Sequence, residues 1–137
     1  MIGVLIIAHA DLGASFIHCA HHVLGSEQQP LLHVANLPIT LQDNPEQLLP
    51  IARKLVQALD QGQGVLVLSD ICGATPCNIA RRLVQPGKVA CLAGLSLPML
   101  IRALSYRHEA LETVVEKASS GGKEGVMNIF PDGCNAA

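Results

Sequence analysis

Two kinds of apolar pattern alternate along the chain. Short, mostly apolar runs are typical of buried strands, whereas apolar residues that recur every three or four positions indicate amphipathic helices. The runs predict strands at residues 2–8, 31–37, 65–69 and 88–93, and a short last strand at 125–130 before Pro131-Asp132-Gly133 and a polar tail. The periodic segments predict helices at residues 11–24, between Pro45 and Gly62, between Pro76 and Pro86, from near Pro98 to Arg107, and at residues 109–119.

This alternation of strands and helices predicts an α/β fold with a four-stranded parallel sheet and helices on both faces. Right-handed crossovers, and the strand order common in chains of this length, place the first strand beside the third. The expected order is therefore 2-1-3-4. The 137 residues contain no linker and no internal repeat, so we expect a single domain over residues 1–137.

Two prolines mark the starts of helices. Asn44 and Thr75 each precede a proline, which is the pattern of an N-cap followed by the first helical position, where a missing N–H does no harm. We therefore expect Asn44 and Thr75 to cap their helices. Pro50 falls inside the second helix and predicts either a bend or a start one turn later.

Composition excludes several classes of partner. Half of the residues are hydrophobic, but the chain has one Tyr, two Phe and no Trp, so the core is aliphatic and stacking on nucleic-acid bases is disfavoured. The net charge is −2 and there are no runs of like charge, so the chain has no electrostatic attraction for nucleic acid or for an anionic membrane surface. No apolar stretch is long enough for a membrane span. The first Lys or Arg is Arg53, which argues against a signal peptide and predicts a cytoplasmic protein.

The five cysteines are odd in number and include no C-x-x-C pair. Reduced thiols, most of them buried, are therefore expected in preference to disulfides or a zinc site.

The candidate chemistry lies where the first and third strands end, at His9 and Asp70. Neighbouring strands lie about 4.8 Å apart, so these two side chains are expected to meet. A carboxylate that accepts one imidazole N–H fixes the tautomer and stabilises the cation, which suits a proton shuttle or a phosphoryl acceptor. The loop Gly73-Ala74-Thr75 favours the phosphoryl acceptor, because it leads into a helix N-terminus that can bind an anion. No P-loop, G-x-G-x-x-G or G-x-S-x-G motif is present.

Simpler roles remain open for the same residues. A histidine that ends a buried strand can be structural, Asp70 can bond only the backbone of its loop, and Thr75 can serve only as an N-cap. A further group, His18, Cys19, His21 and His22, places two histidines one turn apart on a predicted helix. No carboxylate lies near it in sequence, so we do not assign it as a metal site.

Four spaced segments together carry a family resemblance: His9 after its apolar strand, Asp70-Ile-Cys-Gly-Ala-Thr-Pro-Cys-Asn78, Gly94-Leu-Ser-Leu-Pro-Met-Leu100 and Gly122-Lys-Glu-Gly-Val126. In this order they resemble the enzyme IIA component of the mannose family of bacterial sugar phosphotransferase systems (PTS). The resemblance implies that His9 accepts a phosphoryl group from the phosphocarrier HPr and passes it to enzyme IIB, with Asp70 hydrogen-bonded to it. It also implies a homodimer whose short antiparallel strand is exchanged between subunits, no cofactor, and contact with a membrane only through a permease.

Several positions depart from the family pattern. Cys72 stands where a tryptophan that contributes to partner docking is expected, Ala74 replaces a glycine, Thr75 a serine and Cys77 a phenylalanine. Three alternatives to a transport role follow. The chain could be a regulatory phosphoprotein without its own permease, a metal-binding or structural domain, or the phosphoryl-transfer subunit of a dihydroxyacetone kinase. The segments Thr75-Pro76 and Pro98-Met99 favour the mannose type over the kinase subunit.

Overall fold

The computed structural model describes residues 1–25 and 32–136. In chain order the elements are β1 (Gly3–His9), α1 (Leu12–Leu24), β2 (Val34–Ile39), α2 (Pro45–Leu59), β3 (Val65–Ser69), α3 (Thr75–Leu83), β4 (Val89–Ala93), α4 (Leu97–Ser105), α5 (Leu111–Glu124), β5 (Met127–Phe130) and β6 (Gly133–Ala136).

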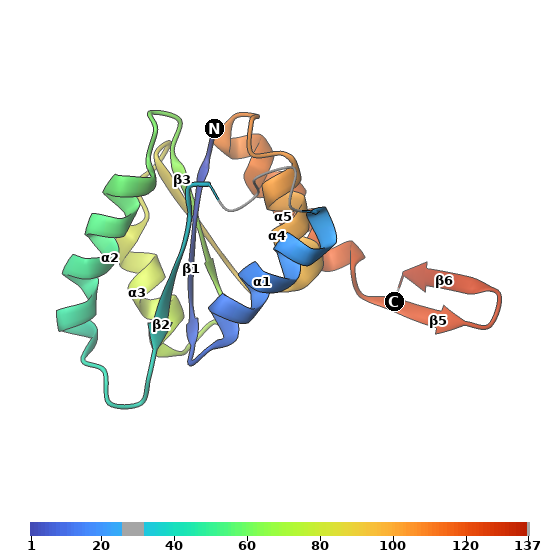
Figure 1. Cartoon of the computed structure of the whole chain (residues 1–137), viewed down its shortest axis with the longest axis horizontal. Helices are drawn as coiled ribbons and strands as arrows, with labels where there is room; N and C mark the ends of the chain where they lie inside the picture. Colours follow the sequence, from blue (N-terminus) through green and yellow to red (C-terminus); the bar gives the residue numbers. More distant parts are fainter. Residues whose placement is uncertain (26–31, 137) are drawn as a thin grey trace.

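β1 to β4 form a parallel sheet in the order β2-β1-β3-β4, which confirms the predicted topology. Helices α2 and α3 cover one face, and α1, α4 and α5 cover the other (Figure 1). The central strands β1 and β3 are buried on both faces, and Val4, Leu5, Leu66 and Val67 have no exposed surface. Because neighbouring residues on each strand face opposite sides, the two strands supply both aliphatic cores.

The helix starts are predicted correctly at α2 but not at α3. The Asn44 side chain accepts a hydrogen bond from the Glu46 N–H at 3.0 Å, and α2 continues from Pro45 through Pro50. In α3 the N-cap is Ala74 rather than Thr75, because the Ala74 carbonyl already accepts the first helical hydrogen bond, from Asn78 N–H at 3.0 Å.

The second strand lies further along the chain than predicted. It was expected at residues 31–37, with Pro38 in a loop, but β2 runs from Val34 to Ile39; residue 31 lies outside the described ranges. β2 is an edge strand that pairs with β1 alone, and an edge tolerates a proline because one side of the strand needs no N–H donor.

The last helix is longer than its periodicity suggested. α5 extends five residues beyond the predicted end at 119, through Gly121 and Gly122 to Glu124. Side chains at these two positions would overlap Arg102 and Met99 of α4, so glycine allows the two helices to approach closely. Packing against α4 therefore offsets the low helix propensity of glycine. Among the described residues, no helix combines the length and apolar character needed to cross a membrane.

The chain ends in a hairpin that the sequence only half predicted. β5 was expected, but the residues after Pro131 form a second strand, β6, that pairs antiparallel with β5 in a separate two-stranded sheet. The hairpin extends away from the body of the domain (Figure 1). All four residues of β5 are exposed, including Ile129 at 77% and Phe130 at 46%.

Candidate active site

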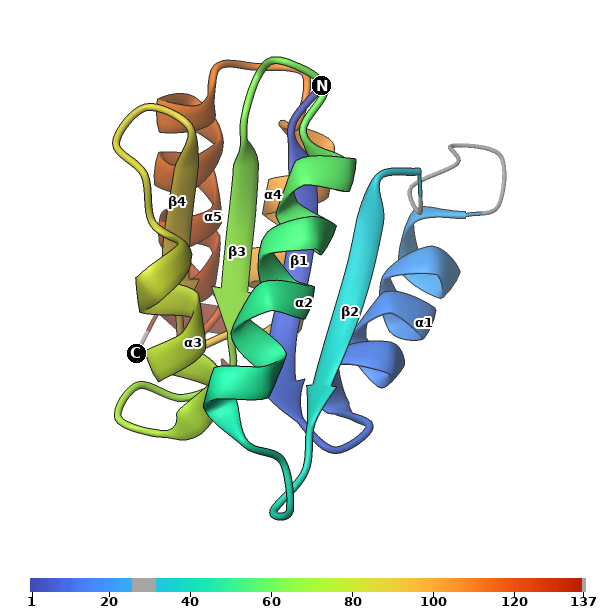
Figure 2. The same cartoon turned by 90° about the vertical axis from the view of Figure 1, so that its left-hand side faces the viewer.

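The site lies at the edge of the sheet where the parallel strands end, the lower end in Figure 2. Ile7 of β1 is in register with Ser69 of β3, so the next residues along both strands emerge side by side. His9 ends β1, and Asp70 follows β3 directly. The crevice outside the carboxyl ends of such strands is where α/β proteins bind ligands.

His9 and Asp70 are in direct contact, as the strand order predicted. Nδ1 of His9 lies 2.7 Å from Oδ2 of Asp70. The two side chains differ in exposure: 47% of His9 is accessible but only 10% of Asp70. The carboxylate is therefore held beneath the ring. Within the described residues Nε2 of His9 has no hydrogen-bond partner, so that nitrogen is available to a ligand.

Asp70 also binds the backbone around it. Its Oδ2 accepts the His9 N–H at 3.0 Å, and its Oδ1 accepts the Ile71 N–H at 2.9 Å. Loop capping and support of His9 were alternatives from the sequence; the structure shows that the same carboxylate does both.

These contacts lower the pKa of Asp70. Burial alone would raise it, but the hydrogen bonds from the His9 backbone, the His9 ring and the Ile71 backbone favour the charged form by more. Asp70 is thus a carboxylate at neutral pH and can only accept hydrogen bonds. Nδ1 of His9 must then carry the proton, which leaves the lone pair on Nε2.

Ala10 turns the chain sharply after His9. Its φ of +48° lies in the left-handed region that non-glycine residues seldom adopt, while its N–H is held by the Ile39 carbonyl at 2.8 Å. Such strain tends to cluster at functional sites. The sequence carried no signal for it, because left-handed turns are usually recognised by glycine or asparagine.

The loop Gly73-Ala74-Thr75 follows Asp70 and leads into α3. Gly73 has φ +91°, with no atom within 4 Å of where a side chain would begin, so the backbone conformation is what requires glycine there. Thr75 occupies the first helical position, and the N–H groups of a first helical turn are the kind of neutral donors that can bind an anion. In the part of the chain that is described, no hydrogen bond joins these three residues to His9.

The cysteines are free but less buried than expected. Cys77 is buried and Cys91 half-buried, whereas Cys19, Cys72 and Cys134 are exposed, so the prediction that most are buried is wrong. The three exposed cysteines lie on the outward face of α1, on the loop after β3 and on the hairpin. Which of these surfaces is covered depends on tertiary packing. Burial, assisted by a hydrogen bond with Cys72, raises the pKa of Cys77, and burial raises that of Cys91 to about 11.

The histidines of the group on α1 differ in exposure. His18 and His22 are exposed, whereas Nδ1 of His21 is buried without a hydrogen-bond partner. Over residues 1–25 and 32–136, no group of three or more His, Cys, Asp or Glu side chains is arranged to hold a metal ion.

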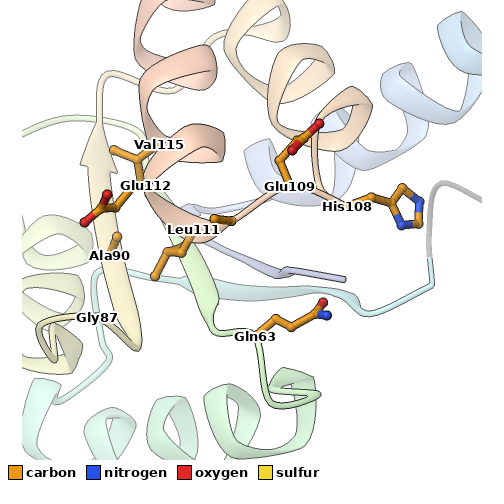
Figure 3. Close-up of a pocket in the computed structure, with 9 residues that line it drawn as sticks. Gln63, Gly87, Ala90, His108, Glu109, Leu111, Glu112 and Val115 are labelled. Atoms are coloured by element: carbon orange, nitrogen blue, oxygen red, sulfur yellow. The ribbon is translucent and has the colours of Figure 1, made fainter.

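A cleft of about 690 Å³ lies at the other end of the sheet, where β3 and β4 begin. Figure 3 shows Leu111, Glu112 and Val115 of α5 beside β4, with Gln63, His108 and Glu109 on the connecting segments. It is larger than the hollow of about 190 Å³ beside Leu12. It nevertheless lacks a pair of side chains in reactive contact, so we place the chemistry at His9.

The fold and this edge of the sheet define an α/β domain with a histidine–carboxylate pair open to solvent. Residues 3–119 match the family model EIIA-man, described as PTS system fructose IIA component, and the chain belongs to this family. It is thus a PTS enzyme IIA component of the mannose family, as its motifs predicted.

Individual relatives agree with this assignment. The chain is 28% identical over 131 residues to the mannose-specific EIIAB component of the PTS of Escherichia coli K12, a match that covers 93% of this chain and 39% of the relative. The chain therefore spans about two fifths of the length of the curated relatives it matches. The mannose/sorbose-specific IIA subunit of Enterococcus faecalis superposes with a TM-score of 0.81 at 21% identity, covering 94% and 95% of the two chains. Component EIIA of the phosphotransferase system of Streptococcus agalactiae superposes with a TM-score of 0.79 at 23% sequence identity, and the match covers 93% of this chain and 97% of that one. These two structures support the fold.

The lowered pKa of Asp70 predicts a pH-dependent stability difference. A carboxyl with a lower pKa in the folded state stabilises the protein above its unfolded pKa of about 3.9, and this contribution is lost as the pH falls through the folded value. In urea unfolding, the free-energy advantage of wild type over Asp70→Asn should therefore be larger at pH 7 than at pH 3. An equal difference at both values would show that the charge of Asp70 adds nothing to the fold.

Proposed function

We propose that this chain is a phosphoryl carrier that accepts a phosphoryl group from phospho-HPr on Nε2 of His9 and passes it to an enzyme IIB during sugar uptake. The observation that carries the proposal is the 2.7 Å contact between Nδ1 of His9 and Asp70, beneath a ring that is half exposed. Membership of the enzyme IIA family supports the same role.

The transfer step uses the lone pair of Nε2. It attacks the phosphorus atom of the donor's phosphohistidine, a new N–P bond forms as the donor's N–P bond breaks, and the donor imidazole leaves with the electron pair. The His9 ring then carries a proton on Nδ1 and the phosphoryl group on Nε2, so it becomes cationic. Asp70 stabilises that cation at hydrogen-bond distance, and its burial limits competition from water. The reverse attack by enzyme IIB returns His9 to the neutral state.

The loop after Asp70 is proposed to hold the phosphoryl oxygens. Gly73 and Ala74 present backbone without large side chains, and Thr75 adds a hydroxyl at the first position of α3. Hydrogen bonds from backbone N–H groups suit a phosphoryl group because they are in place before the charge shifts. Cys72, exposed on the same loop, is proposed to contact the partner.

Transfer between proteins places this chain in the cytoplasm, where HPr and enzyme IIB would meet it, with a permease as its link to a membrane. A regulatory phosphoprotein would share the first half of the cycle. Delivery to enzyme IIB distinguishes the two roles, because a purely regulatory protein would keep its phosphoryl group.

His9 is the acceptor in this proposal. Incubation with phosphoenolpyruvate, enzyme I and HPr should give an acid-labile, base-stable phosphoprotein, and His9→Ala should remove the label completely. His18→Ala changes another exposed histidine and serves as the matched control. If His9→Ala is labelled fully, on His18 or His33 for example, the acceptor has been misassigned.

Asp70 should affect the rate of transfer more than the fold. Asp70→Asn keeps the size and much of the loop bonding but loses the charge that stabilises the imidazolium and the tautomer. We expect phosphorylation to slow by ~10- to 100-fold, less than in a serine protease, where the equivalent change also disrupts proton transfer. Stopped-flow transfer rates and melting temperatures should be measured together. An unchanged rate with a lowered melting temperature would leave loop capping as the sole role of Asp70.

We further propose a homodimer in which the hairpin β5–β6 packs on a second copy. An isolated two-stranded hairpin is marginally stable in water, yet this one exposes Met127, Ile129 and Phe130. The outer edge of β4 has no neighbouring strand among the described residues, so its backbone groups can pair with a strand from another molecule. Exchange of the hairpin between two subunits would cover both exposed features.

The dimer can be tested on the hairpin itself. Truncation after Glu124 should give monomer or aggregate in size-exclusion chromatography with light scattering. Ile129→Asp in the full chain should give a folded monomer, because it places a charge in the proposed interface. His22→Asp adds a similar charge to α1 as a control. A dimer that survives both hairpin changes would mean that another surface holds the subunits together.

A further inference from the structure

Three thiols lie close together beside the loop that follows β3. Cys72 is exposed on that loop, Cys77 is buried in the first turn of α3, and Cys91 is half-buried on β4, which α3 covers (Figure 2). Cys91 is near enough to both other thiols for their charge to help raise its pKa. The other two cysteines lie on different elements, Cys19 on α1 and Cys134 on β6.

Cys72 and Cys77 are in direct contact. Their side chains are joined by a hydrogen bond, and the Cys77 sulfur also accepts a hydrogen bond from the Gly73 N–H. The influence of these two thiols on Cys91 is electrostatic. The pair of cysteines in contact is therefore Cys72 and Cys77.

The backbone between these two cysteines allows them to move closer. A disulfide needs an S–S distance of about 2.05 Å and Cα atoms about 4.4–6.8 Å apart, so a hydrogen-bonded pair of thiols must tighten. Cys77 is held by α3, which leaves the movement to the loop. Gly73 has φ +91° and no atom within 4 Å of where a side chain would begin, and glycine permits the dihedral changes that bring Cys72 nearer.

The two thiols differ in exposure, which gives them different roles. Cys72 is open to solvent, where a dissolved oxidant reaches it, whereas Cys77 is only 6% exposed. Burial raises the pKa of Cys77, and it raises the pKa of Cys91 to about 11, so both stay protonated at neutral pH and do not react first. Oxidation therefore begins at Cys72, and its neighbour Cys77 is the thiol that completes the bond.

We propose that Cys72 and Cys77 form a redox-active dithiol, that peroxides oxidise it to an intramolecular disulfide, and that this bond slows phosphoryl transfer at His9. The disulfide follows from the contact between the two thiols alone, whereas its effect on His9 rests on the proposed function. A reversible pair of this kind suits the cytoplasm proposed for this chain, where thiols stay reduced until an oxidant appears.

The oxidation is balanced by one peroxide molecule. The Cys72 thiolate attacks one oxygen of hydrogen peroxide and the O–O bond breaks, so that Cys72 becomes a sulfenic acid while hydroxide leaves and takes up the proton that Cys72 had lost. The Cys77 sulfur then attacks the Cys72 sulfur, the S–O bond breaks, and the departing hydroxide takes the Cys77 proton. Two thiols and one peroxide thus give one disulfide and two water molecules, with two electrons passing from sulfur to oxygen. A dithiol reductant reverses the change by exchange.

The disulfide closes a ring around the loop that is proposed to hold the phosphoryl oxygens. Residues 73–75 all lie between the two linked positions. A shift of Cys72 toward α3 also pulls on Ile71, whose N–H holds Oδ1 of Asp70 at 2.9 Å. Because a misplacement of ~1 Å can cost ~100-fold in rate, the oxidised loop is expected to slow the reaction at His9.

Peptide mapping tests the disulfide directly. Trypsin cleaves after Lys54 and Arg81, which leaves both cysteines on one peptide, residues 55–81, with no other cysteine. After the full chain is treated with hydrogen peroxide, this peptide should lose both alkylation sites and two hydrogen atoms of mass, and reductant should restore them. A Cys77 that is still alkylated after peroxide, a link to Cys91, or a cross-link between two chains would each overturn the proposed pair.

Substitutions test the order of the two steps. In Cys77→Ala the sulfenic acid of Cys72 has no partner, so dimedone should trap it. In Cys72→Ala the buried Cys77 should stay unmodified. Cys91→Ala and Cys19→Ser are controls and should form the disulfide as the wild type does. A dimedone adduct on Cys77 in place of Cys72 would refute the assigned order.

Transfer is measured on the same samples after the peroxide is removed. Oxidised wild type should accept a phosphoryl group from phospho-HPr ~10- to 100-fold more slowly than the reduced protein, and reductant should restore the rate. Oxidised Cys91→Ala should show the same loss. Peroxide-treated Cys77→Ala, which cannot close the ring, should not, and an equal loss there would overturn the role of the disulfide.

The remaining outcomes separate this inference from the function on which it rests. An unchanged transfer rate in wild type that mapping shows to be fully oxidised would overturn the effect on His9. Failure of the reduced protein to be labelled at His9 would instead overturn the phosphoryl carrier. The disulfide itself is read by mass and stands or falls without either measurement of transfer.

Discussion

The parallel pairing of β1 with β3 is the constraint on which the site depends. Their register sets Ile7 opposite Ser69, so His9, two residues after Ile7, and Asp70, directly after Ser69, leave the sheet close enough to meet. Both strands are buried on two faces by aliphatic side chains, which makes a change of register costly, since every side chain would face the opposite core. A rigid hydrophobic scaffold thus fixes a polar contact at its rim.

The site separates two electrostatic tasks. A largely buried carboxylate orients His9 and, in the proposed transfer, would stabilise positive charge on its ring, while the start of α3 can meet negative charge with neutral N–H groups.

Exposed apolar side chains lie at two places, one beside His9 and one on the hairpin away from it. Those near His9 include Leu12 and Ile71, which lie on the segments that follow β1 and β3. Those of β5 lie on a hairpin outside the main sheet and suit a lasting contact between copies of the chain. The separation would allow a dimer to form without covering His9.

By itself, the sequence determined the sheet order and the approach of His9 to Asp70, because both follow from apolar periodicity and from the handedness of strand connections. Local patterns were weaker where tertiary contacts compete. The N-cap of α3 is Ala74 and not, as the sequence had predicted, Thr75. β2 includes Pro38, because an edge strand needs N–H donors on one side only. The left-handed turn at Ala10, the double use of Asp70 and the exposure of apolar loop residues were decided by tertiary structure. Each depends on which surfaces other elements happen to cover, and spacing along the chain does not encode that.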